Sequence, residues 1–134
     1  MRVCIVGCGA VGSLFAANLA QLDDVEVWAY DLSQPHVDAI NANGLRLVGA
    51  GEVVGRVQAT TDASALPSCD FGIVATKAMH TEGAIAATTH AFSDGAVASV
   101  QNGIGNEEAV AGHVSRVMRG TTFPAGKILE PGVA

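Results

Sequence analysis

A short apolar run followed by three closely spaced glycines constrains this chain more than any other feature of its sequence. Residues Val3 to Val6 are apolar and include β-branched side chains, which is typical of a strand buried on both faces of a sheet. Gly7, Gly9 and Gly12 follow at once with the spacing G-x-G-x-x-G. An apolar helical stretch comes next. This order predicts the first strand–turn–helix unit of a dinucleotide-binding domain.

Each glycine has a separate physical role in such a unit. Gly7 permits the tight turn after the strand, Gly9 lets a pyrophosphate approach the backbone, and Gly12 allows the helix to pack closely on the sheet. The helix should begin near Ala10 and direct its free N–H groups at the phosphates. The motif alone also fits a glycine-rich turn without a ligand, because such turns are common. We predict that the loop binds a dinucleotide through Gly7, Cys8, Gly9, Ala10, Val11 and Gly12.

The length of 134 residues is that of one domain, and an apolar content of 49% is ample for its core. The net charge of −6 argues against nucleic acid or an anionic membrane as a partner. No apolar run approaches the ~20 residues of a membrane span. Met1 and Arg2 lead directly into the first strand, without the pattern of a signal peptide. We therefore expect a cytoplasmic domain spanning residues 1–134.

The cysteines and histidines favour neither a disulfide framework nor a metal site. Cys4, Cys8 and Cys69 contain no C-x-x-C pair, and the four histidines lie far apart in the sequence. Buried free thiols in a reducing compartment fit this pattern best. The histidines are expected on helices or at the surface, with two of them, His36 and His113, solvated.

Apolar strand patterns alternate with helical ones along the chain, which predicts an α/β fold with a Rossmann-type doubly wound parallel sheet. Three short β-like pieces between residues 45 and 59 are expected to form an antiparallel excursion before that sheet resumes. Asn106 is expected to cap a helix, and Val133 to begin a further strand. The expected strands are Val3–Val6, Val25–Tyr30, Phe71–Thr76, Ala96–Val100 and Arg116–Phe123, and the expected helices are Gly12–Leu22, one after Ser33, Thr81–Ala91 and one from Asn106.

Polar residues recur where the predicted strands end. In a doubly wound sheet, ligands bind beyond the carboxyl ends of the strands. These positions hold Gly9, Asp31, Lys77, Asn102 and Thr121. Their convergence on one edge is the main functional indication after the glycine-rich motif.

Asp31 lies 19 residues beyond Gly12, at the spacing of the acid that accepts hydrogen bonds from the adenosine ribose. A carboxylate there would repel a 2′-phosphate, so NAD should be preferred to NADP. The alternative is an ordinary aspartate in the turn before a helix. Lys77 could meet the cofactor phosphates or the substrate end of the nicotinamide, or could be a solvated surface lysine. Asn102 offers an amide donor and acceptor, or forms a simple Asn-Gly turn.

Taken together, four segments resemble the ketopantoate reductase family, the 2-dehydropantoate 2-reductases. The resemblance covers the whole chain, and its second and third segments are the more specific ones. The segments are Gly7-Cys8-Gly9-Ala10-Val11-Gly12, Thr76-Lys77-Ala78, Gln101-Asn102-Gly103-Ile104-Gly105-Asn106-Glu107-Glu108 and Gly120-Thr121-Thr122.

The resemblance implies reduction of the 2-keto group of ketopantoate with NADPH, on the way to pantothenate and coenzyme A. It implies a Rossmann-type cofactor domain followed by a helical domain, with substrate in the cleft between them. It also implies that Lys77 touches the cofactor and that Asn102 lies beside nicotinamide and substrate, which makes both candidate catalytic residues.

Two departures from the family pattern modify these expectations. NADPH-using members tend to carry an arginine near the end of the second strand, where this chain has Tyr30-Asp31-Leu32. That favours NAD, and with it relatives that act on other 2-keto or 2-hydroxy acids. The chain also ends at Ala134, before the domain that holds the family's catalytic lysine and acidic substrate-binding residue. We expect an isolated cofactor domain or a fragment that is inactive alone. It lacks the C-terminal helical domain of the full-length protein, which could form a homodimer.

The leading hypothesis is thus the cofactor domain of a nicotinamide-dependent oxidoreductase that reduces a small 2-keto acid to the 2-hydroxy acid. The rival is a NAD-sensing regulatory domain of the kind that gates potassium transport, which has a similar length, glycine motif and acid. Lys77 and the Asn102-Gly103 tip distinguish the two, since a sensor has no evident need for them.

Overall fold

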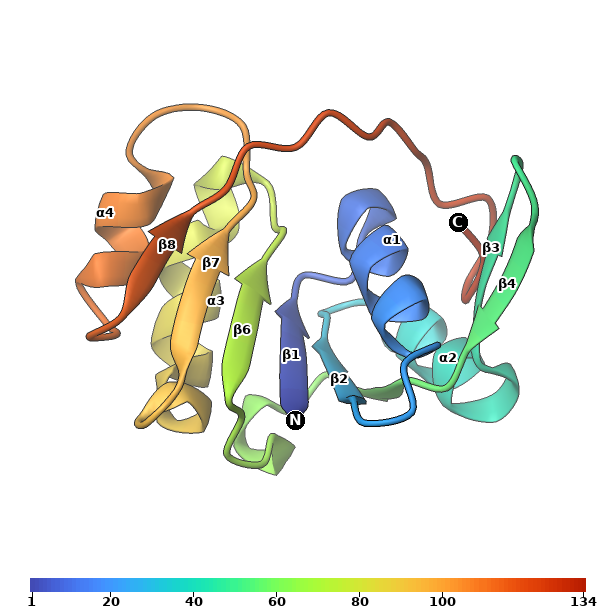
Figure 1. Cartoon of the computed structure of the whole chain (residues 1–134), viewed down its shortest axis with the longest axis horizontal. Helices are drawn as coiled ribbons and strands as arrows, with labels where there is room; N and C mark the ends of the chain where they lie inside the picture. The colour runs from blue at the N-terminus through green and yellow to red at the C-terminus, as the bar shows by residue number, and fades with distance from the viewer.

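Six parallel strands form one sheet in the order β5-β2-β1-β6-β7-β8, in a computed structural model that describes all of residues 1–134 (Figure 1). Counted along the chain, this order is 3-2-1-4-5-6, the order of dinucleotide-binding sheets. The prediction of a Rossmann-type doubly wound α/β domain is confirmed. The strands of this sheet are β1 (Arg2–Val6), β2 (Glu26–Tyr30), β5 (Gln58–Thr60), β6 (Phe71–Val74), β7 (Ala96–Ser99) and β8 (Val117–Arg119).

Helices and one hairpin connect the strands of the sheet. The α-helices are α1 (Ala10–Leu19), α2 (Gln34–Asn43), α3 (Thr81–Thr88) and α4 (Asn106–Ala111). Short 3₁₀ turns are η1 (Ala63–Ala65), η2 (Ala78–His80) and η3 (Thr89–Phe92). The hairpin consists of β3 (Leu45–Val48) and β4 (Glu52–Gly55), which pair antiparallel.

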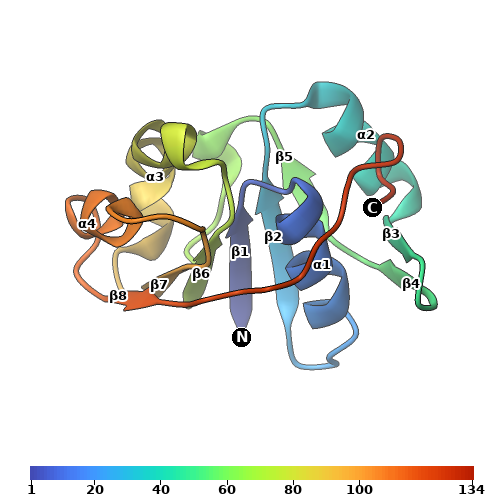
Figure 2. The same cartoon turned by 90° about the horizontal axis from the view of Figure 1, so that it is seen from above.

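The central strand β1 explains why the core has two halves. Because side chains alternate along a strand, Val3 and Ile5 face one layer and Cys4 and Val6 face the other. The first layer contains α1, α2 and the β3–β4 hairpin, and the second contains α3 and α4 (Figure 2). All four side chains are buried, which accounts for the uninterrupted apolar run in the sequence.

Each layer has a glycine at which no room is left for a side chain. A Cβ at Gly55, the last residue of β4, would lie 2.7 Å from Ala17 Cα in α1. On the opposite layer, a Cβ at Gly72 in β6 would lie 2.6 Å from Phe92 Cε1. The absence of a side chain at these points therefore lets the hairpin reach α1 and lets Phe92 lie against the sheet.

The structure corrects four details of the sequence interpretation. The third β-like piece between residues 45 and 59 does not join the antiparallel excursion: β5 pairs parallel with β2 and forms the edge of the main sheet. The Asn41 side chain supports this edge by donating to the Ala59 carbonyl at 2.8 Å and accepting from its N–H at 2.9 Å. The strand expected at 116–123 is limited to β8, and the helix expected at 81–91 ends as the 3₁₀ turn η3.

The fourth correction concerns Asn106, which was expected to cap α4. Gly105, with φ of +95°, occupies the capping position, and Asn106 is the first helical residue and only 4% exposed. Its side chain instead bonds to two neighbouring segments, at Thr81 and Asn102. The sequence pattern was right about where the helix begins and wrong about the role of the amide.

The C-terminal residues 120–134 run from β8 across the upper edge of the sheet to the hairpin (Figures 1 and 2). A Cβ at Gly126 would lie 3.7 Å from Ala10 Cβ, so the segment passes the first turn of α1. At its end, the Arg46 N–H donates to the Gly132 carbonyl at 2.9 Å, and Val133 forms a parallel bridge with Arg46. The expected further strand at Val133 is thus present as an isolated bridge.

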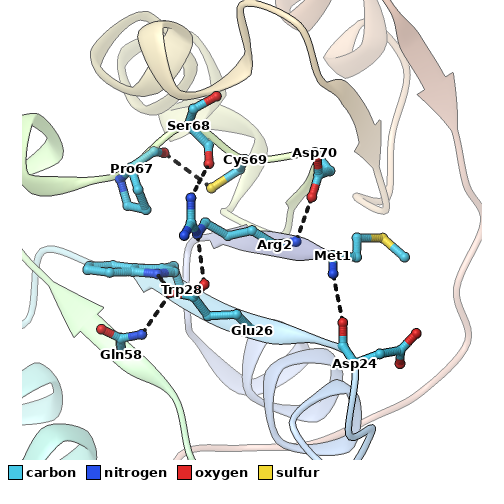
Figure 3. Close-up of polar contacts among 10 residues, drawn as sticks. All are labelled: Met1, Arg2, Asp24, Glu26, Trp28, Gln58, Pro67, Ser68, Cys69 and Asp70. Atoms are coloured by element: carbon cyan, nitrogen blue, oxygen red, sulfur yellow. Dashed lines mark hydrogen bonds and ion pairs between the residues drawn. The ribbon is translucent and has the colours of Figure 1, made fainter.

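At the opposite edge of the sheet, where the strands begin, several side chains make polar contacts with one another (Figure 3). Arg2 Nε donates to Glu26 Oε2 at 2.9 Å, and Arg2 Nη1 donates to the Ser68 carbonyl at 3.0 Å. Trp28 Nε1 and Gln58 Nε2 both donate to Glu26 Oε1. Hydrogen bonds from Trp28 and Arg2 lower the pKa of the Glu26 carboxyl.

None of the helices has the length and apolar character needed to cross a membrane.

The contact between Gly55 and α1 yields a test of the packing. Gly55→Ala should lower the free energy of unfolding by about 1–3 kcal/mol, because the added methyl group collides with backbone atoms of Ala17. The matched control is Gly51→Ala, since a Cβ at Gly51 meets nothing within 4 Å. Urea denaturation of both variants checks this, and equal stability would contradict the close approach.

Candidate functional site

The glycine-rich loop between β1 and α1 has the shape that the three predicted glycine roles require. Gly7 has φ of +91°, and a Cβ there would lie 2.6 Å from Thr76 Cγ2. A Cβ at Gly12 would lie 2.0 Å from the Gly7 carbonyl oxygen, so the helix packs directly on the loop. A Cβ at Gly9 would meet nothing within 4 Å. Two glycines are thus required by the fold, whereas Gly9 leaves open space above the loop.

Helix α1 presents unpaired N–H groups to that space. Gly9 is its N-cap and has no side chain that could accept from these groups, and no acidic residue lies in the first turn. The Ser13 N–H donates to the Gly9 carbonyl at 2.8 Å, which is the first hydrogen bond of the helix. The N–H groups of Ala10 and Val11 therefore have no acceptor within the chain. Such a helix start attracts an anionic group.

Three polar side chains fix Cys8 at the centre of the loop. Its N–H donates to Asp31 Oδ2 at 2.9 Å. Its carbonyl accepts from Ser13 Oγ at 3.1 Å and lies 2.9 Å from His36 Nε2. Burial raises the pKa of the Cys8 thiol to about 12, so this group is neutral at physiological pH and acts as core packing. The backbone of Cys8, and not its sulfur, shapes the loop.

His36 is one of the residues that the sequence interpretation placed wrongly. It was expected to be solvated, but it is only 5% exposed. Its Nδ1 accepts from the Gly132 N–H at 2.9 Å, so Nε2 carries the ring proton and donates to the Cys8 carbonyl. His36 therefore joins the loop to the C-terminal segment. Gly132 lies 96 residues away in sequence, so no local pattern could have indicated this contact.

Asp31 follows β2 directly and lies beside the loop, as predicted. Its Oδ2 accepts from the Cys8 N–H and its Oδ1 from the Ser33 N–H, both at 2.9 Å. Each carboxylate oxygen has a second lone pair, so both can accept further hydrogen bonds. The residue is half-buried. Asp31 thus has a structural role in the loop and retains the capacity to bind a hydroxyl group.

Lys77 and Asn102 lie at the neighbouring strand tips, after β6 and β7, and both are exposed. Lys77 makes no ion pair within the chain. The two tips are joined underneath by Gln101, whose Nε2 donates to the Thr76 carbonyl at 2.7 Å. Thr121 is exposed just beyond β8, and its neighbour Thr122 donates to the Val100 carbonyl at 3.1 Å.

The remaining chemically versatile side chains do not form a second centre. Cys4, Cys8 and Cys69 are free and buried, as predicted. His80 and His90 are exposed, whereas His113, expected to be solvated, is half-buried and lies 2.6 Å from Glu82 Oε1. No three His, Cys, Asp or Glu side chains are placed to hold a metal ion.

The arrangement identifies the carboxyl edge of the sheet as the candidate site. Strand β1 lies at the point where the sheet order reverses, with β2 on one side and β6 on the other. In open α/β sheets, ligands bind in the crevice at this point. Asp31 lies on the β2 side and Lys77 on the β6 side of the glycine-rich loop. An elongated ligand with a central anionic group fits these positions.

Comparison with known proteins agrees with this geometry. The family model described as "Ketopantoate reductase PanE/ApbA" matches residues 3–134. The chain belongs to the ketopantoate reductase family. A 2-dehydropantoate 2-reductase of Pyrococcus abyssi is 37% identical over 134 residues, and one of Halobacterium salinarum is 33% identical over 138. These matches cover 99% of this chain but only 43% and 45% of the relatives.

Solved structures of a ketopantoate reductase and of a dehydrogenase show the same fold. The PanE/ApbA family ketopantoate reductase from Ralstonia eutropha JMP134 superposes with a TM-score of 0.91 at 31% identity, covering 99% of this chain and 45% of that one. A D-mandelate dehydrogenase in complex with NADH and anilino(oxo)acetate superposes with a TM-score of 0.87 at 28% identity, covering 99% and 44%. This chain therefore spans less than half the length of the relatives that it matches.

The buried contacts of His36 lead to a stability prediction. His36→Ala should lower the free energy of unfolding at pH 7 by about 1–3 kcal/mol, because the Gly132 N–H loses its acceptor and the Cys8 carbonyl loses a donor. His90→Ala is the matched control, since His90 is exposed, and it should change stability by less than about 0.5 kcal/mol. Thermal and urea denaturation measure both. An unchanged His36→Ala variant would contradict the assigned contacts.

Proposed function

We propose that residues 1–134 bind a nicotinamide dinucleotide and form the cofactor-binding part of an oxidoreductase that reduces a small 2-keto acid to the 2-hydroxy acid. One observation carries this proposal: the unpaired N–H groups of Ala10 and Val11 open onto free space at Gly9, between Asp31 and the tips at Lys77 and Asn102. Membership of the ketopantoate reductase family supports it.

The residues present fit each part of such a cofactor. The pyrophosphate would lie over Gly9, where the N–H groups of α1 meet its charge. The adenosine ribose would lie at Asp31, whose oxygens retain lone pairs for its hydroxyl groups. The nicotinamide half would then extend across the reversal point of the sheet to Lys77 and Asn102.

The nicotinamide ring, when bound, supplies the hydride to the C2 carbon of the keto acid. Asn102 can orient the ring or the substrate through its amide, and Lys77 can place a positive charge near the phosphates or the carboxylate of the substrate. The reaction also needs a proton donor. More than half of each matched relative lies outside the matched region, and we propose that the donor belongs to that part. Residues 1–134 alone should then bind cofactor without turnover.

The names of the relatives support a substrate class. The curated relatives are 2-dehydropantoate 2-reductases, and one structural neighbour is a D-mandelate dehydrogenase with NADH. Both names refer to 2-keto or 2-hydroxy acids, so we propose this class without choosing a member.

A homodimer of the full-length protein and residence in the cytoplasm stay predictions. The rival function, a NAD-sensing domain of potassium transport, is not favoured by the family match.

The first test concerns the loop. Gly9→Val should leave folding intact, because Gly9 has an extended backbone with φ of −70° and free space around its Cβ position. It should weaken NADH and ADP-ribose binding by at least about tenfold, since the side chain would occupy the position of the pyrophosphate. Gly51→Val is the control, at a glycine with equal space. Calorimetric titration decides, and equal affinities of wild type and Gly9→Val would refute the site.

The second test concerns the choice between NAD and NADP. We expect NADH to bind about tenfold more tightly than NADPH, because a 2′-phosphate beside Asp31 meets like charge. Asp31→Ala with Leu32→Arg should shift the preference towards NADPH, since Leu32 is 76% exposed and an arginine there can reach the phosphate.

Leu32→Arg alone is the matched control, because it adds the cation and keeps the carboxylate. Dissociation constants for NADH and NADPH on all three proteins separate the two effects. Tenfold tighter binding of NADPH by the unmodified chain would show that Asp31 does not select the cofactor.

A further inference from the structure

The exposed tips at Lys77 and Asn102 stand on a ring of hydrogen bonds that reaches into the core. The ring consists of Gln101, Thr81 and Asn106 together with the backbone at Thr76 and Asn102. We propose that Gln101, Thr81 and Asn106 are positioning residues, which hold the two tips in the geometry that receives the nicotinamide half of the cofactor. This inference rests on the proposed function.

Gln101 joins the end of β7 to the end of β6. Its Nε2 donates to the Thr76 carbonyl at 2.7 Å and contacts Thr76 Oγ1 at 3.0 Å. Its Oε1 accepts from Ser99 Oγ at 3.1 Å. The peptide that leads into Lys77 is therefore tied to the peptide that leads into Asn102. A shift of one tip would break the contacts of the other.

Thr81 and Asn106 close the ring from below. Gln101 Nε2 donates to Thr81 Oγ1 at 2.7 Å, and Thr81 Oγ1 donates to Asn106 Oδ1 at 3.2 Å. Asn106 Nδ2 then donates to the Asn102 carbonyl at 3.1 Å. Thr81 is 1% exposed and Asn106 is 4% exposed, so neither polar group can exchange its partner for bulk water.

The tip at Asn102 has few other contacts with the rest of the chain. Gly103 and Gly105 both have positive φ, at +103° and +95°, and Ile104 between them is 92% exposed. No apolar side chain of the tip packs into the core. The hydrogen bond from Asn106 to the Asn102 carbonyl is therefore the contact that fixes where the Asn102 amide is presented.

Thr81 provides a matched pair of variants. Thr81→Val keeps the shape of the side chain and removes the hydroxyl group, whereas Thr81→Ser keeps the hydroxyl group. NADH and ADP-ribose are the probes, because ADP-ribose lacks the nicotinamide ring. Thr81→Val should weaken NADH binding about fivefold and change ADP-ribose binding less than about twofold, and Thr81→Ser should restore NADH binding.

A purely structural role predicts a different result. Equal losses for both probes in Thr81→Val, or no loss for either, would overturn the positioning role. So would a wild-type chain that binds NADH no more tightly than ADP-ribose. If Thr81→Val fails to fold by circular dichroism, Asn106→Asp takes its place, since it keeps the acceptor for Thr81 and removes the donor to Asn102. A wild-type chain that binds neither probe would instead refute the proposed function.

Discussion

The direct contact between the start of α1 and the loop before it is the constraint on which the rest of the structure depends. A Cβ at Gly12 would lie 2.0 Å from the carbonyl oxygen of Gly7, so the helix approaches the loop as closely as backbone allows. This approach seats α1 on β1 and leaves its first N–H groups pointing past Gly9 without acceptors. The packing of the core and the anion-attracting character of the loop are thus consequences of one contact.

The two edges of the sheet differ in how their polar groups are used. At the amino edge, Arg2, Trp28 and Gln58 all donate to Glu26, so the charges of Arg2 and Glu26 have partners within the chain (Figure 3). At the carboxyl edge, the N–H groups of Ala10 and Val11 and the ammonium group of Lys77 have no protein partner. Unsatisfied groups that converge on one edge, at the reversal point of a parallel sheet, are typical of a ligand site.

Local sequence patterns predicted much of the fold and the outline of the candidate site. The apolar run of β1 and the glycine spacing specified the first unit, and the strand ends placed Asp31, Lys77 and Asn102 on one edge. The interpretation failed where a side chain bonds to a segment distant in sequence. From sequence, His36 was expected to be solvated and Asn106 to cap a helix, because polar side chains are mostly exposed and their distant partners are not visible in the sequence.

The sequence by itself determined the class of fold and the position of the glycine-rich loop, and it predicted the edge at which a ligand would bind. Periodicity and glycine spacing express short-range physics, since they record which face of an element is buried and where the backbone must turn. The tertiary structure alone decided that β5 completes the sheet in parallel, that residues 120–134 return to the loop through His36, and that buried amides support the tip at Asn102. Those outcomes depend on partners far apart in the chain, whose hydrogen bonds form only after the layers have packed.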